Sequence, residues 1–231
     1  MLSALAPPAA SVPPATVSAI RPIEGTRPAA TIFALSLEVA SFVLLWTTVN
    51  HLSAILALSA TAFYLGIYTM WLKRSSPQNI VIGGAAGAVP VLVGWSAVTG
   101  SLGLAPFMMF GIIFLWTPPH FWALAVRYKD DYARANVPML PSIATASKVT
   151  HQIVAYVAAV WALSLALGPV AHMGMAYDAV ALALGAGFMY YAVALLRDPT
   201  PKRAMRLFGF SITYLTALFV AMGVLAVVHV R

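Results

Sequence analysis

Long apolar segments separated by short polar loops make up the chain from about residue 31 onwards. Each segment is long enough to cross a hydrocarbon core of about 30 Å, because a helix rises roughly 1.5 Å per residue. Only helices or closed barrels satisfy the backbone in a bilayer, and these segments lack the alternation of barrel strands. The pattern therefore predicts an all-α fold, a polytopic membrane helical bundle. Its seven transmembrane helices are expected at residues 31–50, 53–72, 79–99, 103–126, 150–168, 175–196 and 207–229.

The first 30 residues differ sharply from the rest. They are rich in Pro, Ala and Ser, and their only charged side chains are Arg21, Glu24 and Arg27. Such a composition buries too little apolar surface to order a chain. We therefore expect a disordered tail at residues 1–30 and a transmembrane domain at residues 31–231. The tail lacks the basic region of a signal peptide, and its arginines are too sparse to favour a mitochondrial transit peptide.

Composition supports the membrane assignment and excludes several chemistries. Charged residues make up 8% of the chain and hydrophobic residues 61%, and the mean hydropathy is +0.89. The absence of cysteine excludes disulfides and thiolate catalysis. The net charge of +7 lies in short loops between helices rather than on a binding face, so nucleic acid is not an expected partner.

The distribution of basic residues predicts the orientation. Twelve of the 13 Lys and Arg residues fall on one side of the predicted membrane, and only Arg231 falls on the other. Cytoplasmic loops carry the excess of Lys and Arg. The N-terminus and the 73–78, 127–149 and 197–206 loops are therefore expected in the cytoplasm, and the C-terminus outside.

The segment from Trp116 to Pro141 carries the most distinctive polar chemistry. An adjacent acidic pair, Asp130 and Asp131, follows the fourth helix among Arg127, Lys129 and Arg134. In one interpretation the two carboxylates only solvate a helix end. In the other, which we favour, they bind Mg²⁺ that bridges to a diphosphate, while the basic side chains contact the phosphate oxygens.

A second polar group closes the second helix on the same side of the membrane. Lys73 and Arg74 follow Tyr68 there, and they either set the topology or reach the same phosphate as Asp130. Asn79 begins the next helix and is a candidate helix cap. The glycines that follow it, Gly83, Gly84, Gly87 and Gly94, predict close helix packing, which is compatible with a seam beside a substrate groove.

Two ionisable residues lie inside predicted helices. His120 follows Pro118 and Pro119, which are expected to kink the helix and open space nearby. It is either a hydrogen-bonded packing residue or a contact to a porphyrin or metal. Glu38 lies about two turns into the first helix, and it is either a partnered buried carboxyl or a substrate contact.

Two long segments carry a resemblance to a known family. YTMWLKRSSPQNIVIGGAAGAVPVLVGW (Tyr68–Trp95) and WTPPHFWALAVRYKDDYARANVPMLP (Trp116–Pro141) resemble the haem O synthases, or protohaem IX farnesyltransferases, of the UbiA-like intramembrane prenyltransferases. The resemblance covers residues 31–231. It implies nine transmembrane helices around a central cavity that opens towards the cytoplasm, and the seven helices predicted for this chain correspond to the third through the ninth.

The resemblance also implies a reaction. In this family two acidic motifs hold Mg²⁺ and farnesyl diphosphate, and a vinyl group of haem B attacks the farnesyl cation. Water then completes the hydroxyethylfarnesyl group of haem O. The product implies haem A synthase or terminal oxidase assembly as a partner, and the lipid bilayer of a bacterial inner membrane as the location, ahead of the mitochondrial inner membrane.

Roles for individual residues follow from the matching motifs. Asp130 and Asp131 fall in the second acidic region and are the expected metal ligands, and Lys73 and Arg74 fall in the basic element that pairs with diphosphate. The expected substrate-binding residues are His120, Arg127, Lys129, Tyr68, Asn79 and Glu38. Aromatic faces at Tyr64, Tyr68, Phe121 and Tyr128 either shield a carbocation or serve only as packing residues.

The chain departs from the family pattern in two ways. Its second acidic motif is an adjacent pair instead of D-x-x-x-D, and none of its asparagines begins the first motif, N-x-x-x-D-x-x-x-D. We therefore expect an N-terminally truncated haem O synthase, which the upstream coding DNA would test. The alternatives are an inactive paralogue that binds haem or lipid and, less favoured, a transporter.

Overall fold

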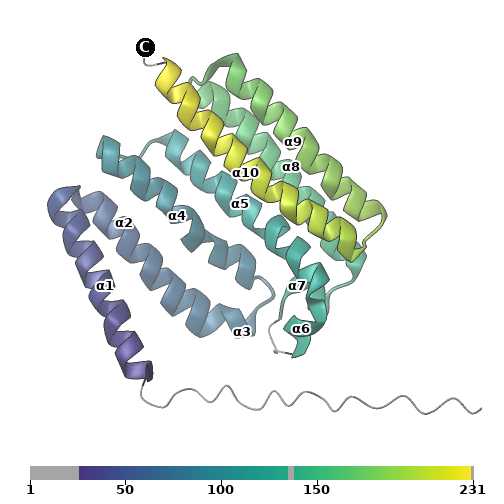
Figure 1. The fold of residues 1–231 in the computed structure, drawn as a ribbon, viewed down its shortest axis with the longest axis horizontal. Helices are drawn as coiled ribbons and strands as arrows, with labels where there is room; N and C mark the ends of the chain where they lie inside the picture. The colour runs from purple at the N-terminus through teal and green to yellow at the C-terminus, as the bar shows by residue number, and fades with distance from the viewer. Residues whose placement is uncertain (1–25, 135–137, 230–231) are drawn as a thin grey trace, which may run out of the picture. The chain divides into compact units, whose positions relative to one another are not determined.

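The computed structural model describes residues 26–134 and 138–229, which form helices throughout and contain no strand (Figure 1). The helices are α1 (Thr26–Thr48), α2 (His51–Ala62), the π-helix η1 (Phe63–Leu72), α3 (Lys73–Ser75), α4 (Asn79–Thr99), α5 (Leu104–Arg127), α6 (Lys129–Arg134), α7 (Leu140–Ile143), α8 (Ala146–Val170), α9 (Gly174–Arg197) and α10 (Pro201–His229).

The prediction of seven spanning helices is confirmed. Seven helices in the described part of the chain are long and apolar enough to cross a membrane, so this is a multi-pass membrane protein. Three of them begin four or more residues earlier than expected: the first starts at Thr26 instead of residue 31, the fifth at Ala146 instead of residue 150, and the last at Pro201 instead of residue 207. The predicted bounds follow the apolar segments and therefore leave out charged first turns. A helix can continue beyond the hydrocarbon core, and it can start at a proline.

The chain divides into two compact units, residues 1–40 and residues 41–231. In the first unit, the helical residues begin at Thr26, five positions before the predicted start, and Ile32, Phe33, Leu35 and Leu37 are exposed along them. The predicted disordered tail falls almost entirely on residues 1–25, which lie outside the described residues.

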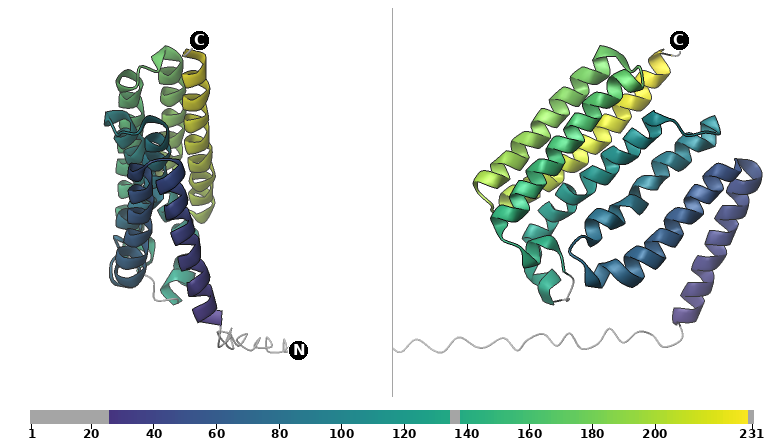
Figure 2. Two further views of the ribbon diagram at one scale, coloured as in Figure 1. Left: turned by 90° about the vertical axis from the view of Figure 1, so that its left-hand side faces the viewer. Right: turned by 180° about the vertical axis from the view of Figure 1, so that it is seen from behind.

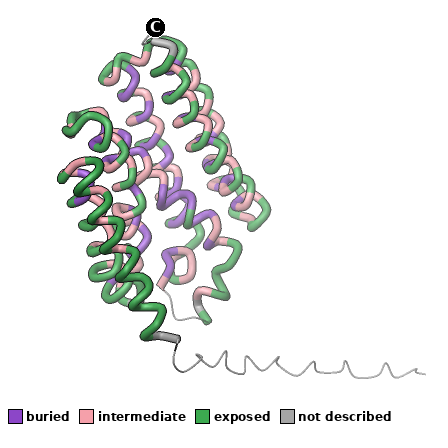
Figure 3. Tube along the Cα trace, turned by 60° about the vertical axis from the view of Figure 1, so that its left-hand side comes forward, coloured by how far each residue is buried: buried purple, intermediate pink, exposed green. Residues whose placement is uncertain are grey.

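The second unit is built around α5. This helix packs against α4, α8 and α10, while α9 closes the bundle between α8 and α10, and α2 packs on the far side of α4 (Figure 1). Figure 2 shows α8, α9 and α10 side by side from two further directions. Buried positions gather on the facing sides of these helices, as Figure 3 shows, with Ile112, Trp122, Ile153, Phe188 and Leu207 among the fully buried residues.

Polar contacts and close packing fix the helices against one another. Ser164 on α8 pairs with the hydroxyl of Tyr214 on α10 at 2.7 Å, and the hydroxyl of Tyr177 on α9 donates to the carbonyl of Ser164 at 2.9 Å. A methyl group at Gly185 would overlap the indole of Trp161. Small residues and buried hydrogen bonds are the devices that hold helices together where lipid removes the hydrophobic driving force.

Candidate active site

An apolar cavity lies between α2, η1, α4 and α5. Its volume is about 660 Å³, which lies within the usual range for sites that bind small ligands. Four aromatic residues and three glycines make up half of its lining residues. The lining residues are Ala60, Thr61, Tyr64, Leu65, Tyr68, Ile80, Gly83, Gly84, Ala86, Gly87, Ile113, Trp116, Thr117 and Phe121.

The π-helix supplies two aromatic rings of this wall. Tyr64 and Tyr68 stack with their ring centroids 5.2 Å apart, and Thr69 donates from its hydroxyl to the carbonyl of Tyr64 at 2.9 Å. The wider turn of a π-helix often marks a functional site in proteins. The sequence did not predict this π-helix, because the same ten mainly apolar residues are equally compatible with an α-helix.

Glycines on α4 leave room for the facing side chains. A methyl group at Gly83 would overlap the ring of Tyr68, and one at Gly84 would lie 3.0 Å from Cγ2 of Thr117 on α5. Gly83 and Gly84 therefore pack closely against their neighbours, as the sequence predicts, whereas the same prediction is wrong for Gly87 and Gly94, which have open space at Cβ. Gly83 and Gly84 also line the cavity, so the close contact between helices forms part of the cavity wall.

His120 lies beside the cavity, in the contact between α5 and α10. Its Nδ1 pairs with the hydroxyl of Ser211 at 2.7 Å, and its ring stacks against Trp116 at 4.2 Å and Phe208 at 4.5 Å. The helix continues through Pro118 and Pro119, and His120 itself is buried, although Thr117 and Phe121 near it line the cavity. The contacts are those of a hydrogen-bonded packing histidine. Trp116 and Phe121, which flank His120 in the sequence of α5, line the cavity.

The acidic pair begins a short helix directly after α5. Asp130 and Asp131 occupy the first turn of α6 and are exposed, and the carboxylate of Asp131 accepts from the guanidinium of Arg134. Lys129 is exposed beside them, and Arg127 lies with its guanidinium 5.7 Å from the ring centroid of Tyr128. Tyr128 therefore contacts a cation at the helix end and is not part of the cavity wall.

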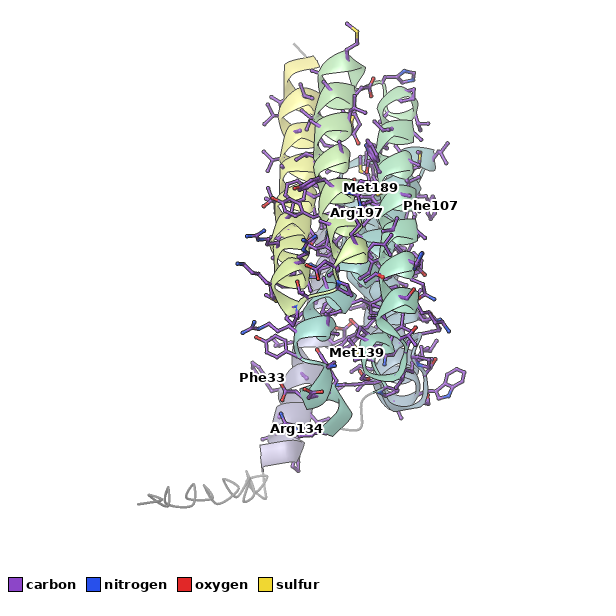
Figure 4. All side chains as sticks on the ribbon, turned by 90° about the vertical axis from the view of Figure 1, so that its right-hand side faces the viewer. Phe33, Phe107, Arg134, Met139, Met189 and Arg197 are labelled. Carbon is purple, nitrogen blue, oxygen red and sulfur yellow. The ribbon has the colours of Figure 1, made fainter. Side chains whose placement is uncertain are left out.

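Tyr132 links this short helix to the cavity. It packs against a small buried cluster of Ile80, Ala125 and Met139, and Ile80 also lines the cavity. Figure 4 shows Met139 and Arg134 towards one end of the second unit. The charged loop and the apolar cavity are therefore joined by one packed contact.

Lys73 and Arg74 lie at the same end of the second unit. Lys73 is exposed at the start of α3, where the chain passes from η1 towards α4. Of Arg74 only the backbone is described. Within the described residues α3 makes no close backbone contact with α6. We call this end of the second unit, with α3 and α6, the charged mouth. The joint action of these basic residues and the aspartates on a diphosphate stays a prediction.

Asn79 does not cap α4, and the capping interpretation is wrong. Gln78 occupies the cap position, and its side chain makes no capping hydrogen bond. The side chain of Asn79 is 1% exposed, and neither its Nδ2 nor its Oδ1 has a hydrogen-bond partner among the described residues. A buried, unpaired carboxamide costs free energy, which makes Asn79 the least explained polar group near the site.

Glu38 belongs to the first unit and is half-buried there. Its role as a substrate contact stays a prediction.

The aspartate pair suits a magnesium ion in part. Mg²⁺ is usually held by one or two carboxylates together with water and substrate phosphates, and two adjacent exposed carboxylates supply that donor set. No group of three or more His, Asp or Glu side chains gathers in the described part of the chain. The assignment of Asp130 and Asp131 as metal ligands stays a prediction.

Comparison with known proteins decides the family. The profile of the UbiA prenyltransferase family matches residues 24–228. The chain belongs to this family. This UbiA-family chain is 51% identical over 197 residues to the protoheme IX farnesyltransferase of Parafrankia sp. (strain EAN1pec), a match that covers 84% of the chain and 63% of that relative. No solved structure matches significantly.

Two further relatives carry the same name. The protoheme IX farnesyltransferase of Frankia alni is 52% identical over 202 residues, covering 85% of this chain and 69% of the relative. That of Synechocystis sp. is 54% identical over 195 residues, covering 84% and 62%. The chain thus spans about two thirds of the length of the relatives it matches.

Proposed function

We propose that this chain transfers the farnesyl group of farnesyl diphosphate to a vinyl group of protohaem IX, yielding haem O. The C1–O bond of the farnesyl group breaks and diphosphate leaves with the electron pair. The vinyl π electrons then form a bond to C1, and water adds to the resulting porphyrin-stabilised cation with loss of a proton. The observation that carries the proposal is the identity of about half of the residues with relatives named for this activity.

The cavity suits an isoprenoid chain. A farnesyl group is wholly apolar, and the wall presents Tyr64, Tyr68, Trp116 and Phe121 with few polar groups. Aromatic faces stabilise a nearby cation through their quadrupoles. Closely packed rings also exclude water from an allylic cation until the vinyl group has reacted. The wall would therefore both bind the hydrocarbon and protect the intermediate.

The charged mouth suits the diphosphate. Arg127 and Lys129 would contact its oxygens, with Lys73 and Arg74 approaching from the other flank. Asp130 and Asp131 would hold Mg²⁺, which neutralises the negative charge that develops on the leaving diphosphate. Preorganised charges aimed at a developing charge are the largest single contribution in many enzymes. This assignment uses Asp130 and Asp131 as one half of a metal site.

The test is haem O formation in cells that lack their own haem O synthase. We expect the full chain to restore haem O, measured by mass spectrometry of extracted haems. Asp130→Asn and Asp131→Asn should each lower its formation by about 100-fold, the usual scale for losing one electrostatic contact to a transition state.

The matched control is Asp198→Asn. Asp198 pairs with Arg203 at 3.0 Å in the loop between α9 and α10, away from the cavity. This variant should form haem O like the parent chain. The farnesyltransferase proposal is contradicted if the membrane-inserted chain forms no haem O. The metal-site assignment fails if all three aspartate variants behave alike.

A further inference from the structure

A second cavity lies on the outer side of the contact between α9 and α10. Its volume is about 450 Å³, and the residues that define it are Tyr190, Tyr191, Arg203, Arg206, Phe210 and Thr213. It shares no lining residue and no helix with the apolar cavity of the candidate active site. We call it the α9–α10 groove. Tyr190, Arg206 and Thr213 are exposed, so the groove opens outwards from the bundle.

The two arginines of the groove have different surroundings. Arg203 donates from Nη1 to the carbonyl of Ala194 at 2.8 Å and pairs through Nε with Asp198 at 3.0 Å, so it is held against α9. Arg206 has no hydrogen bond or ion pair to another described residue. Four basic residues (Arg197, Lys202, Arg203 and Arg206) and one acidic residue (Asp198) make the segment 197–206 net +3. In Figure 4 nitrogen-tipped side chains project from the lower part of α10, near Arg197.

The part of the groove farther from the 197–206 segment is aromatic. The rings of Tyr191 and Phe210 lie 4.9 Å apart, and those of Tyr190 and Tyr191 lie 5.3 Å apart. The ring of Phe210 occupies the space that a side chain at Gly187 would need. The groove therefore changes from cationic to aromatic along its length, in a wall that packing holds in place.

Helix α10 has 29 residues, which span about 43 Å and exceed a hydrocarbon core of about 30 Å. Because Lys and Arg side chains are costly inside the hydrocarbon, the first turns of α10, with Arg203 and Arg206, are expected at the level of the lipid headgroups. Thr213 lies roughly 10 Å further along the helix than Arg206, at the level of the acyl chains.

We propose that the α9–α10 groove binds an anionic phospholipid. Its phosphate would take the open guanidinium of Arg206, which suits phosphate oxygens in a bidentate arrangement, and its glycerol and first acyl carbons would lie over Tyr190 and Phe210. Basic pockets between transmembrane helices at the membrane surface commonly recognise acidic lipid headgroups. A zwitterionic lipid places a second cation beside Arg206 and is disfavoured.

The experiment measures lipid retention by native mass spectrometry. The full chain, purified in detergent, is given phosphatidylglycerol or phosphatidylcholine with the same acyl chains. We expect preferential retention of phosphatidylglycerol. Arg206→Gln should weaken that retention about fivefold, the scale of one basic residue at an acidic membrane surface. Lys202→Gln removes the same charge outside the groove and should leave retention unchanged.

A second variant tests the groove itself without changing charge. Thr213→Trp fills the acyl end from an exposed position, so it should fold and should also lose the lipid. Equal loss in Arg206→Gln and Lys202→Gln would overturn the proposal, as would equal retention of the two lipids or full retention by Thr213→Trp. Displacement of phosphatidylglycerol by millimolar inorganic phosphate would instead identify a soluble anion. Haem O formation is measured separately, so failure of the lipid site and failure of the farnesyltransferase proposal are distinguishable.

Discussion

At the residue scale, Asn79 is distinguished by what surrounds its carboxamide. Asn50, on the neighbouring helix, is fully used: its Oδ1 accepts from the amide of Ser53 at 2.8 Å and its Nδ2 donates to the carbonyl of Ser96 at 2.7 Å. Asn79 is more deeply buried and has no partner among the described residues. Asn79 does not line the cavity of the candidate active site, and its role as a substrate contact stays a prediction.

This contrast predicts opposite effects of the same substitution. Asn79→Leu should leave the free energy of unfolding unchanged or raise it, because an apolar group of similar shape replaces an unpaired one, while haem O formation falls. Asn50→Leu should lower the free energy of unfolding by about 1–3 kcal/mol because it removes a cap and an interhelical bond. Thermal unfolding in detergent and haem O mass spectrometry check both. Equal destabilisation by the two variants would mean that Asn79 has a structural partner.

At the element scale, the contact between η1 and α4 determines where the Tyr68 ring lies. Gly83 provides the space for that ring, and the stacked pair of Tyr64 and Tyr68 then forms one wall of the cavity. The shape of the cavity therefore depends on the lack of a side chain at Gly83 on α4 and on the π-helical hydrogen bonding of η1.

A single methyl group should disturb this arrangement. Gly83→Ala places Cβ inside the Tyr68 ring, so the ring must move, and we expect haem O formation to fall at least tenfold with a loss of about 1–3 kcal/mol in stability from overpacking. Gly94→Ala, on the same helix, has open space at Cβ and should gain about 0.5–1 kcal/mol from lower backbone entropy. Unfolding curves and haem O formation separate the two. A Gly83→Ala chain that matches Gly94→Ala in both would refute the role given to Gly83.

At the scale of the whole molecule, the sequence predicts what depends on length and charge. The seven spans follow from hydropathy because each must match the bilayer. The start of α10 was predicted six residues too late because Lys202, Arg203 and Arg206 suggest a loop, although they are the first turns of a helix. The π-helical hydrogen bonding of η1 and the lack of a partner for the Asn79 side chain among the described residues depend on which residues pack against them. The hydrophobic periodicity of the sequence does not encode those contacts. The Asp130 and Asp131 pair is recognised from sequence, whereas its link to the cavity through Tyr132 requires the fold.

Orientation in the membrane is the remaining whole-molecule prediction. The ten Lys and Arg residues between positions 41 and 229 all lie at the end of the second unit that carries α3 and α6. The residues that join the helices at the opposite end, 49–50, 100–103 and 171–173, contain none. The positive-inside rule then places the charged mouth of the cavity in the cytoplasm, where a water-soluble diphosphate would reach it.

The absence of cysteine allows a direct test of this orientation. Ser101→Cys and Ser147→Cys introduce single thiols at exposed positions at the two opposite ends of the second unit. A membrane-impermeant maleimide should label the Ser101→Cys chain in intact cells and the Ser147→Cys chain only after permeabilisation. Because each variant has one thiol, the parent chain is an unlabelled control. The reverse pattern would invert the topology and place the diphosphate end outside the cell, where the proposed substrate route would fail.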